Sequence, residues 1–97
     1  MSIYMIIDAT VKDKEKYQEY IERVSPIVAR FGGRYHVRGE DIEAFGSWKP
    51  QRIIVLEFPS KAHVRKWLAS EEYGEIAPLR EAGADAQAIL IEGCQKE

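Results

Sequence analysis

The sequence predicts a single α+β domain with the element order β-α-β-β-α-β. Three observations support this prediction. Four short runs are rich in β-branched and aromatic residues, the segment between the first two runs has apolar residues at helical spacing, and Gly, Pro and Ser separate the segments. At 97 residues the chain has the length of one domain, which we place over residues 1–97.

The first two elements are a strand over 3–9 and a helix that starts at Asp13. The strand has the sequence IYMIIDA. The apolar residues that follow recur every three or four positions, as on the buried face of a helix; they are Tyr17, Tyr20, Ile21, Val24, Val28 and Phe31. Asp13 is a suitable N-cap, and Pro26 should kink the helix. The Gly pair at 32–33 should end it, with one glycine in the left-handed conformation.

Two further strands are expected at 34–38 (RYHVR) and 52–58 (RIIVLEF). The polar, glycine-containing segment 39–50 between them is typical of a long loop. The 52–58 strand has apolar side chains on both faces, whereas a strand with one face in water would alternate. Something must therefore cover its second face.

The C-terminal part predicts two short helices and a last strand. Ser60 is a suitable N-cap for a helix over 61–69. A second helix is expected over 71–82 and should close at Gly83. The last strand, AQAILIEG, covers 86–93.

This order is the split βαβ, or ferredoxin-like, arrangement. Right-handed crossovers place the helical segments on one side of a four-stranded antiparallel sheet. We expect strands 3–9 and 52–58 to be adjacent and parallel, with strand 34–38 antiparallel to the latter.

Alternation sorts the strand residues onto two faces. The face expected under the helices is apolar and carries Ile3, Met5, Ile7, Tyr35, Val37, Ile54, Leu56, Phe58, Ile89 and Ile91. The other face mixes apolar and titratable side chains: Tyr4, Ile6, Asp8, His36, Arg38, Ile53, Val55, Glu57, Ala88, Leu90 and Glu92. No helix remains to cover it, and monomers rarely expose so large an apolar patch. We therefore expect a homodimer in which two copies bury this face against each other.

Composition and charge argue against several functions. A net charge of −2 provides no basic surface for nucleic acid or an anionic membrane, and no run approaches the roughly 20 apolar residues of a membrane span. The N-terminal run lacks the charged start of a signal peptide, so the expected location is the cytoplasm. The single cysteine, Cys94, excludes an internal disulfide. His36 and His63 lie on different elements, so we expect no metal site, and no cofactor-binding motif is present.

Three polar residues of the second face are candidates for catalysis. The expected strand directions bring Asp8, His36 and Glu57 to one end of the sheet as a cluster. Two close carboxylates raise one pKa, and a histidine exchanges protons near neutrality, which suits proton transfer beside a carbonyl. The alternative is a polar network or an inter-subunit ion pair that neutralises buried charge.

A second set of candidates could hold a carboxylate ligand, because a guanidinium group can bind both carboxylate oxygens. The set consists of Arg38, Trp48, Arg52, Tyr73 and Arg80. The alternative is structural. Arg38 and Arg52 would then hold the 39–50 loop, and Tyr73 and Arg80 would hold the second helical segment against the sheet edge.

Four motifs occur in the order and spacing of a known family: GGRYHVRG (32–39), WKPQRIIVLEFPS (48–60), EEY (71–73) and PLR (78–80). Through them, nearly the whole chain resembles the small bacterial domains of the domain of unknown function 1330 family, in the dimeric α/β-barrel superfamily. That family often has glycine where this chain has Glu40, and an acidic residue and an alanine where it has Ala62 and Val64. The resemblance implies a ferredoxin-like subunit and a homodimer, but no established activity.

Superfamily relatives include cofactor-independent monooxygenases, lactone isomerases, haem proteins that degrade chlorite and stress-linked binding domains, and the fold alone does not choose among them. We consider three hypotheses. The first is a pocket for a small molecule on the second sheet face, with cofactor-independent isomerase or monooxygenase-like chemistry. The second is a non-catalytic dimeric module that binds a small acid or serves in assembly. The third is a structural dimer that binds a partner through the 39–50 loop.

Overall fold

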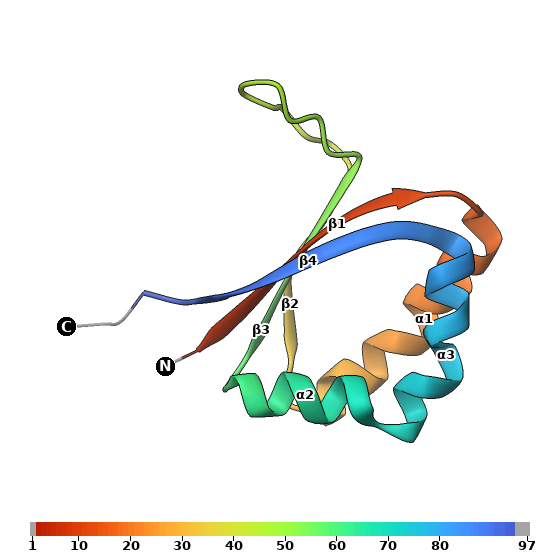
Figure 1. Ribbon diagram of the computed structural model, residues 1–97, viewed down its shortest axis with the longest axis vertical. Helices are drawn as coiled ribbons and strands as arrows, with labels where there is room; N and C mark the ends of the chain where they lie inside the picture. The colour runs from red at the N-terminus through yellow and green to blue at the C-terminus, as the bar shows by residue number, and fades with distance from the viewer. Residues whose placement is uncertain (1, 95–97) are drawn as a thin grey trace.

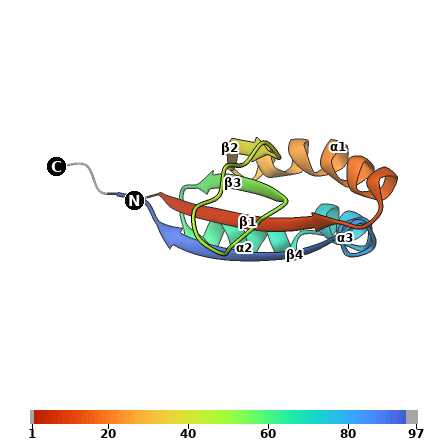
Figure 2. The same ribbon diagram turned by 90° about the horizontal axis from the view of Figure 1, so that it is seen from above.

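The computed structural model describes residues 2–94 and confirms the predicted fold class. Its elements are β1 (Ile3–Val11), α1 (Lys14–Arg30), β2 (Arg34–Gly39), β3 (Arg52–Phe58), α2 (Lys61–Ala69), α3 (Glu71–Gly83) and β4 (Ala84–Glu92). The helices lie on one side of the sheet, and the segment 40–51 extends away on the other side (Figure 1). Seen from above, this segment lies over the strands (Figure 2).

Local sequence explains where the helices begin. Asp13, Ser60 and Ser70 each accept a hydrogen bond from the backbone N–H three residues later, at 3.2, 3.3 and 3.1 Å. These N-caps satisfy donors that the first helical turn leaves free. Gly32 follows α1 with φ +85°, which confirms the predicted left-handed glycine at this helix end.

The strands are ordered β2-β3-β1-β4, and every neighbouring pair is antiparallel. In the β1–β3 ladder, Tyr4 lies opposite Glu57 and Asp8 lies opposite Ile53. The expectation that these two strands are parallel was therefore wrong. The crossover through α1 makes β2 run in the direction of β1, and the return from β2 to β3 reverses it.

The register of β4 reverses the predicted faces of its side chains. Ala88, Leu90 and Glu92 lie opposite Ile7, Met5 and Ile3 on the helical side, so their expected place on the other face was wrong. Ala86 lies opposite Ala9, and Ile89 lies opposite Ile6, so Ile89 and Ile91 point away from the helices. They are 56% and 50% exposed. At the start of β4 the core side is occupied by the small residues Ala84 and Ala86, next to the point where α1 and α3 approach closely. A Cβ on Gly83, just before β4, would lie 2.8 Å from the Tyr17 nitrogen of α1.

A register shift between Tyr35 and Val37 has the same kind of effect in β2. Val37 pairs with Val55 on the uncovered face, while Arg38 pairs with Ile54 on the helical face. Simple alternation assigned Val37 and Arg38 to the opposite faces and was wrong for both. A bulge places an extra residue in one strand, so the residues beyond it change sides.

The hydrophobic core lies between the helices and the sheet. Its largest fully buried side chains are Phe58, Leu56, Ile76, Val28 and Val64. The Phe58 and Trp67 rings stack with centroids 5.4 Å apart, and the Trp67 ring meets Tyr73 edge-on at 5.0 Å. Among residues 2–94, no helix combines the length and hydropathy that a membrane crossing needs.

Candidate functional site

A cleft runs between the helices and the covered face of the sheet. It comprises an inner cavity of about 40 Å³ and two larger hollows, of about 230 and 400 Å³, that share walls with the cavity. We call this the helical-side cleft and define it by its polar and aromatic lining: Tyr17, Tyr20, Tyr35, Arg38, Arg52, Trp67, Tyr73 and Arg80. The larger hollows approach the roughly 300–1,000 Å³ of small-molecule sites.

Arginines make the helical-side cleft positively charged. The Arg52 side chain is 15% exposed, and its Nη1 donates to Oε1 of Glu40 at 3.0 Å. Arg80 lines both the inner cavity and the 230 Å³ hollow, and it forms no ion pair within residues 2–94. Of the described residues that line the cleft, Glu40 is the one carboxylate, and it lies in the 400 Å³ outer hollow.

Aromatic rings position two of these guanidinium groups. The Arg38 guanidinium lies 4.5 Å from the ring centroid of Tyr35, and that of Arg52 lies 5.5 Å from the Tyr17 ring. Arg38 Nη1 also donates to Ser25 Oγ at 3.2 Å. Cation–π contacts restrict a flexible arginine while leaving N–H groups free to donate.

The tyrosines of the cleft are neutral hydrogen-bonding groups. The Tyr20 and Tyr73 hydroxyls are 3.2 Å apart and share a hydrogen bond. Burial raises the pKa of Tyr17, Tyr20 and Tyr35, because a phenolate is poorly solvated there, although Arg52 partly offsets the rise at Tyr17. These hydroxyls therefore keep their protons at neutral pH.

Two buried side-chain nitrogens within residues 2–94 have no hydrogen-bond partner: Arg52 Nε and Trp67 Nε1. Both belong to residues that line the inner cavity. Buried donors without a partner are rare in proteins and cost about 1–3 kcal/mol each.

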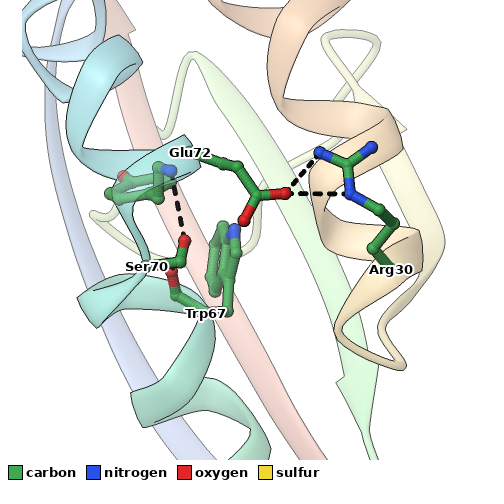
Figure 3. A network of polar contacts seen from close by, with 5 residues as sticks. Arg30, Trp67, Ser70 and Glu72 are labelled. Atoms are coloured by element: carbon green, nitrogen blue, oxygen red, sulfur yellow. Dashed lines mark hydrogen bonds and ion pairs between the residues drawn. The ribbon is translucent and has the colours of Figure 1, made fainter.

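The wall that contains Trp67 is held by polar contacts between the helices (Figure 3). Arg30, in the last turn of α1, donates from Nε and Nη2 to Oε2 of Glu72 at 3.0 and 2.7 Å. Ser70 Oγ donates to the Trp67 carbonyl at 2.7 Å and accepts from the Tyr73 N–H at 3.1 Å. These contacts tie the junction of α2 and α3 to the end of α1.

The opposite side of the sheet carries no helix, and we call it the bare face. It comprises Tyr4, Ile6, Asp8, Arg34, His36, Val37, Ile53, Val55, Glu57, Gln87, Ile89 and Ile91. Trp48, in the segment 40–51, donates from Nε1 to Oδ2 of Asp8 at 3.2 Å, beside a hollow of about 200 Å³. Trp48 therefore lies on the bare face and not with the arginines, contrary to the grouping expected from sequence.

The expected cluster of Asp8, His36 and Glu57 is only partly formed. His36 Nε2 and Glu57 Oε1 are 2.7 Å apart. Hydrogen bonds from Ser2 and His36 lower the pKa of Glu57. Asp8, however, lies four residues along β1 from Tyr4, the partner of Glu57, which is about 13 Å of strand. The prediction of this cluster was wrong because it assumed that β1 and β3 are parallel.

Four of the five residues predicted to hold a carboxylate ligand lie together. Arg38, Arg52, Tyr73 and Arg80 come together in the helical-side cleft. Sequence reasoning placed Tyr17 and Tyr20 on the buried face of the first helix, and this is confirmed. It did not identify Tyr17, Tyr20 or Trp67 as residues that line a cavity. Within the described residues, no three His, Cys, Asp or Glu side chains are grouped as a metal would require.

Comparison with solved structures shows that other proteins share this fold. A protein of unknown function from Rhodopseudomonas palustris matches with TM-score 0.85 and 19% identity, over 98% of this chain and 84% of that one. A dimeric ferredoxin-like protein of unknown function from Jannaschia matches with TM-score 0.74 and 10% identity, over 96% of this chain and 100% of that one. SnoaB, a cofactor-independent oxygenase from Streptomyces nogalater, matches with TM-score 0.67 and 14% identity, over 98% and 95%.

The class of protein is thus a ferredoxin-like α+β domain. The family follows from sequence. Residues 2–94 match the domain of unknown function family DUF1330, and the chain belongs to it. No curated protein matches the chain.

Proposed function

We propose that the protein binds a small carboxylate-bearing molecule in the helical-side cleft. The observation that supports this most is the charge of the lining: three arginines and two lysines against one carboxylate, with mainly aromatic and aliphatic walls around the inner cavity. Guanidinium groups in a low-dielectric cleft favour anions and can bind both oxygens of a carboxylate. The aromatic walls favour an apolar body.

This proposal moves the pocket from the bare face, where the sequence led us to expect it, to the helical side. The expected location rested on Arg38 sharing a face with Asp8, His36 and Glu57. The bulge in β2 turns Arg38 to the other side, beside Arg52 and Arg80. The sheet therefore separates the three arginines from Asp8, His36 and Glu57.

Binding without turnover is the form of this function that the lining favours. The described walls of the inner cavity contain no Asp, Glu or His that could act as a general base, and the tyrosines are protonated. Oxygenase chemistry of the kind named for SnoaB, or isomerisation, would instead consume the ligand. His36 and Glu57 remain a candidate proton-transfer pair, without Asp8, but only for a ligand on the bare face, because the sheet separates them from the helical-side cleft.

The test is a thermal-shift and calorimetric titration with 3-phenylpropanoate and its homologues, each compared with its neutral amide. The carboxylates should raise the melting temperature and the amides should not, because a ligand stabilises the state that it binds. Arg80→Met should weaken carboxylate binding, whereas Arg65→Met, on the exposed surface of α2, should leave it unchanged. Equal shifts with acid and amide would contradict the proposal, and ligand or oxygen consumption would identify an enzyme.

We also propose that the bare face is a homodimer interface. Val37, Ile89 and Ile91 are 44%, 56% and 50% exposed on it, and the Jannaschia relative is described as dimeric. Sedimentation should give twice the 11.1 kDa chain mass. Ile89→Glu should give monomers, whereas Leu68→Glu, which charges an exposed apolar residue of α2, should remain dimeric. A monomeric wild type would contradict this assembly without affecting the ligand proposal.

A further inference from the structure

Glu40 lies where it can compete with a ligand. It belongs to the segment between β2 and β3, and it lines the outer hollow of the helical-side cleft together with Tyr17, Ile21 and Arg52. The same three residues also line the inner cavity, so they form a wall that the outer hollow and the cavity share. An acid entering from the outer hollow would pass Glu40.

The contact between Glu40 and Arg52 is asymmetric. The Arg52 side chain is 15% exposed and that of Glu40 is 68% exposed. Glu40 accepts from Nη1 alone, and Arg52 Nε is buried without a partner. Arg52 is therefore a buried part of the cleft wall. Glu40 is solvated and accepts only one of the hydrogen bonds that the guanidinium can donate.

We propose that Glu40 is a specificity-determining residue that sets how strongly the cleft prefers anions. This inference rests on the proposed function. Glu40 neutralises Arg52 before a ligand binds, and a ligand carboxylate takes its place on the guanidinium. Ion pairs with one exposed partner are weak, so a carboxylate anchored by the apolar walls can displace Glu40. A neutral molecule cannot replace the negative charge that Glu40 supplies to Arg52. Such a molecule therefore does not displace Glu40, and the cleft discriminates against it.

The test compares Glu40→Gln with Glu43→Gln in the full chain. Glu43 is an exposed acid of the same segment that forms neither a hydrogen bond nor an ion pair with Arg52, so its variant removes the same charge without freeing the arginine. With 3-phenylpropanoate as the probe, Glu40→Gln should lower Kd about two- to fivefold, which corresponds to the energy of a partly exposed ion pair. Glu43→Gln should change Kd by less than that, and binding of the neutral amide should not tighten in either variant.

The outcomes separate this inference from the proposed function. If the wild type binds the carboxylate and Glu40→Gln binds it equally or more weakly, the role of Glu40 is overturned and the cleft proposal stands. If only Glu40→Gln binds, Glu40 blocks the cleft and is not displaced by the ligand, which overturns both this inference and the proposed function of the wild type. If neither binds any carboxylate of the series, the proposed function fails, and this inference fails with it. An equal gain in Glu43→Gln would show a general charge effect and would also overturn it.

Discussion

The two sides of the sheet both carry apolar residues but differ in charge. The helical side gathers Arg38, Arg52 and Arg80 among tyrosines. The bare face carries Asp8 and Glu57, each with a side-chain hydrogen bond from its own partner. Neighbouring residues of a strand point to opposite sides, so alternate positions of one sheet place arginines on the helical side and carboxylates on the bare face. A shift of one residue in register therefore moves a side chain from one face to the other.

The two sides also differ in how they are packed. The helical side is closed by aromatic stacking and close helix contacts, so changes there should cost folding free energy. The bare face is open and should matter for association and for weak polar contacts.

Phe58→Ala should be the most damaging of these changes. Phe58 is 0% exposed and stacks on Trp67. Truncating a buried phenylalanine typically costs about 3–5 kcal/mol, from lost burial and the cavity left behind. Urea denaturation would measure it, with Leu68→Ala as an exposed control that should cost less than about 1 kcal/mol. Similar losses in both variants would contradict the packing described for the helical side.

Two glycines of α3 should respond in opposite directions to the same substitution. A Cβ on Gly83 would lie 2.8 Å from the Tyr17 nitrogen and 2.9 Å from its Cα, so α1 would have to move. Gly83→Ala should therefore cost about 1–3 kcal/mol. A Cβ on Gly74 would meet nothing within 4 Å, and Gly74→Ala should stabilise the helix by up to about 1 kcal/mol. Melting temperatures that fall together would contradict the close approach of α1 to α3.

Double-mutant cycles on the bare face should separate its two ends. His36 and Glu57 are in contact, so their alanine substitutions should be non-additive in unfolding free energy. Asp8 and Glu57 belong to different ends of the β1–β3 ladder, so theirs should add within error. A clear Asp8–Glu57 coupling would restore the cluster that the sequence suggested.

The smallest expected effect concerns pH. Hydrogen bonds from Ser2 and His36 hold the pKa of Glu57 below its ordinary value of 4.5. Its contribution to stability is therefore fully present above that value and is lost as the pH falls through the lower, folded-state pKa. Glu57→Gln should lose less stability than the wild type on acidification, measured as melting temperature between about pH 5 and pH 3. Glu43→Gln controls for removing one carboxylate, and identical profiles for both variants would contradict the effect.

Local signals in the sequence predicted most of the fold. The N-caps Asp13 and Ser60, the left-handed Gly32 and the two helices after β3 were read from neighbouring residues, because capping and turn chemistry act within one helical turn. The element order then restricted the topology. The composition of the cleft was partly foreseen in Arg38, Arg52, Tyr73 and Arg80.

Periodicity and short-range capping, both visible in the sequence, define which segments become helices and strands and place one layer of helices on one side of the sheet. The side that each strand residue faces follows instead from how the strands pair in the folded chain. The bulge at His36 turned Arg38 toward the helices, and the pairing of Ala86 with Ala9 turned Ile89 and Ile91 away from them. Register depends on contacts between residues far apart in the chain, and a one-residue difference reverses every side chain beyond it.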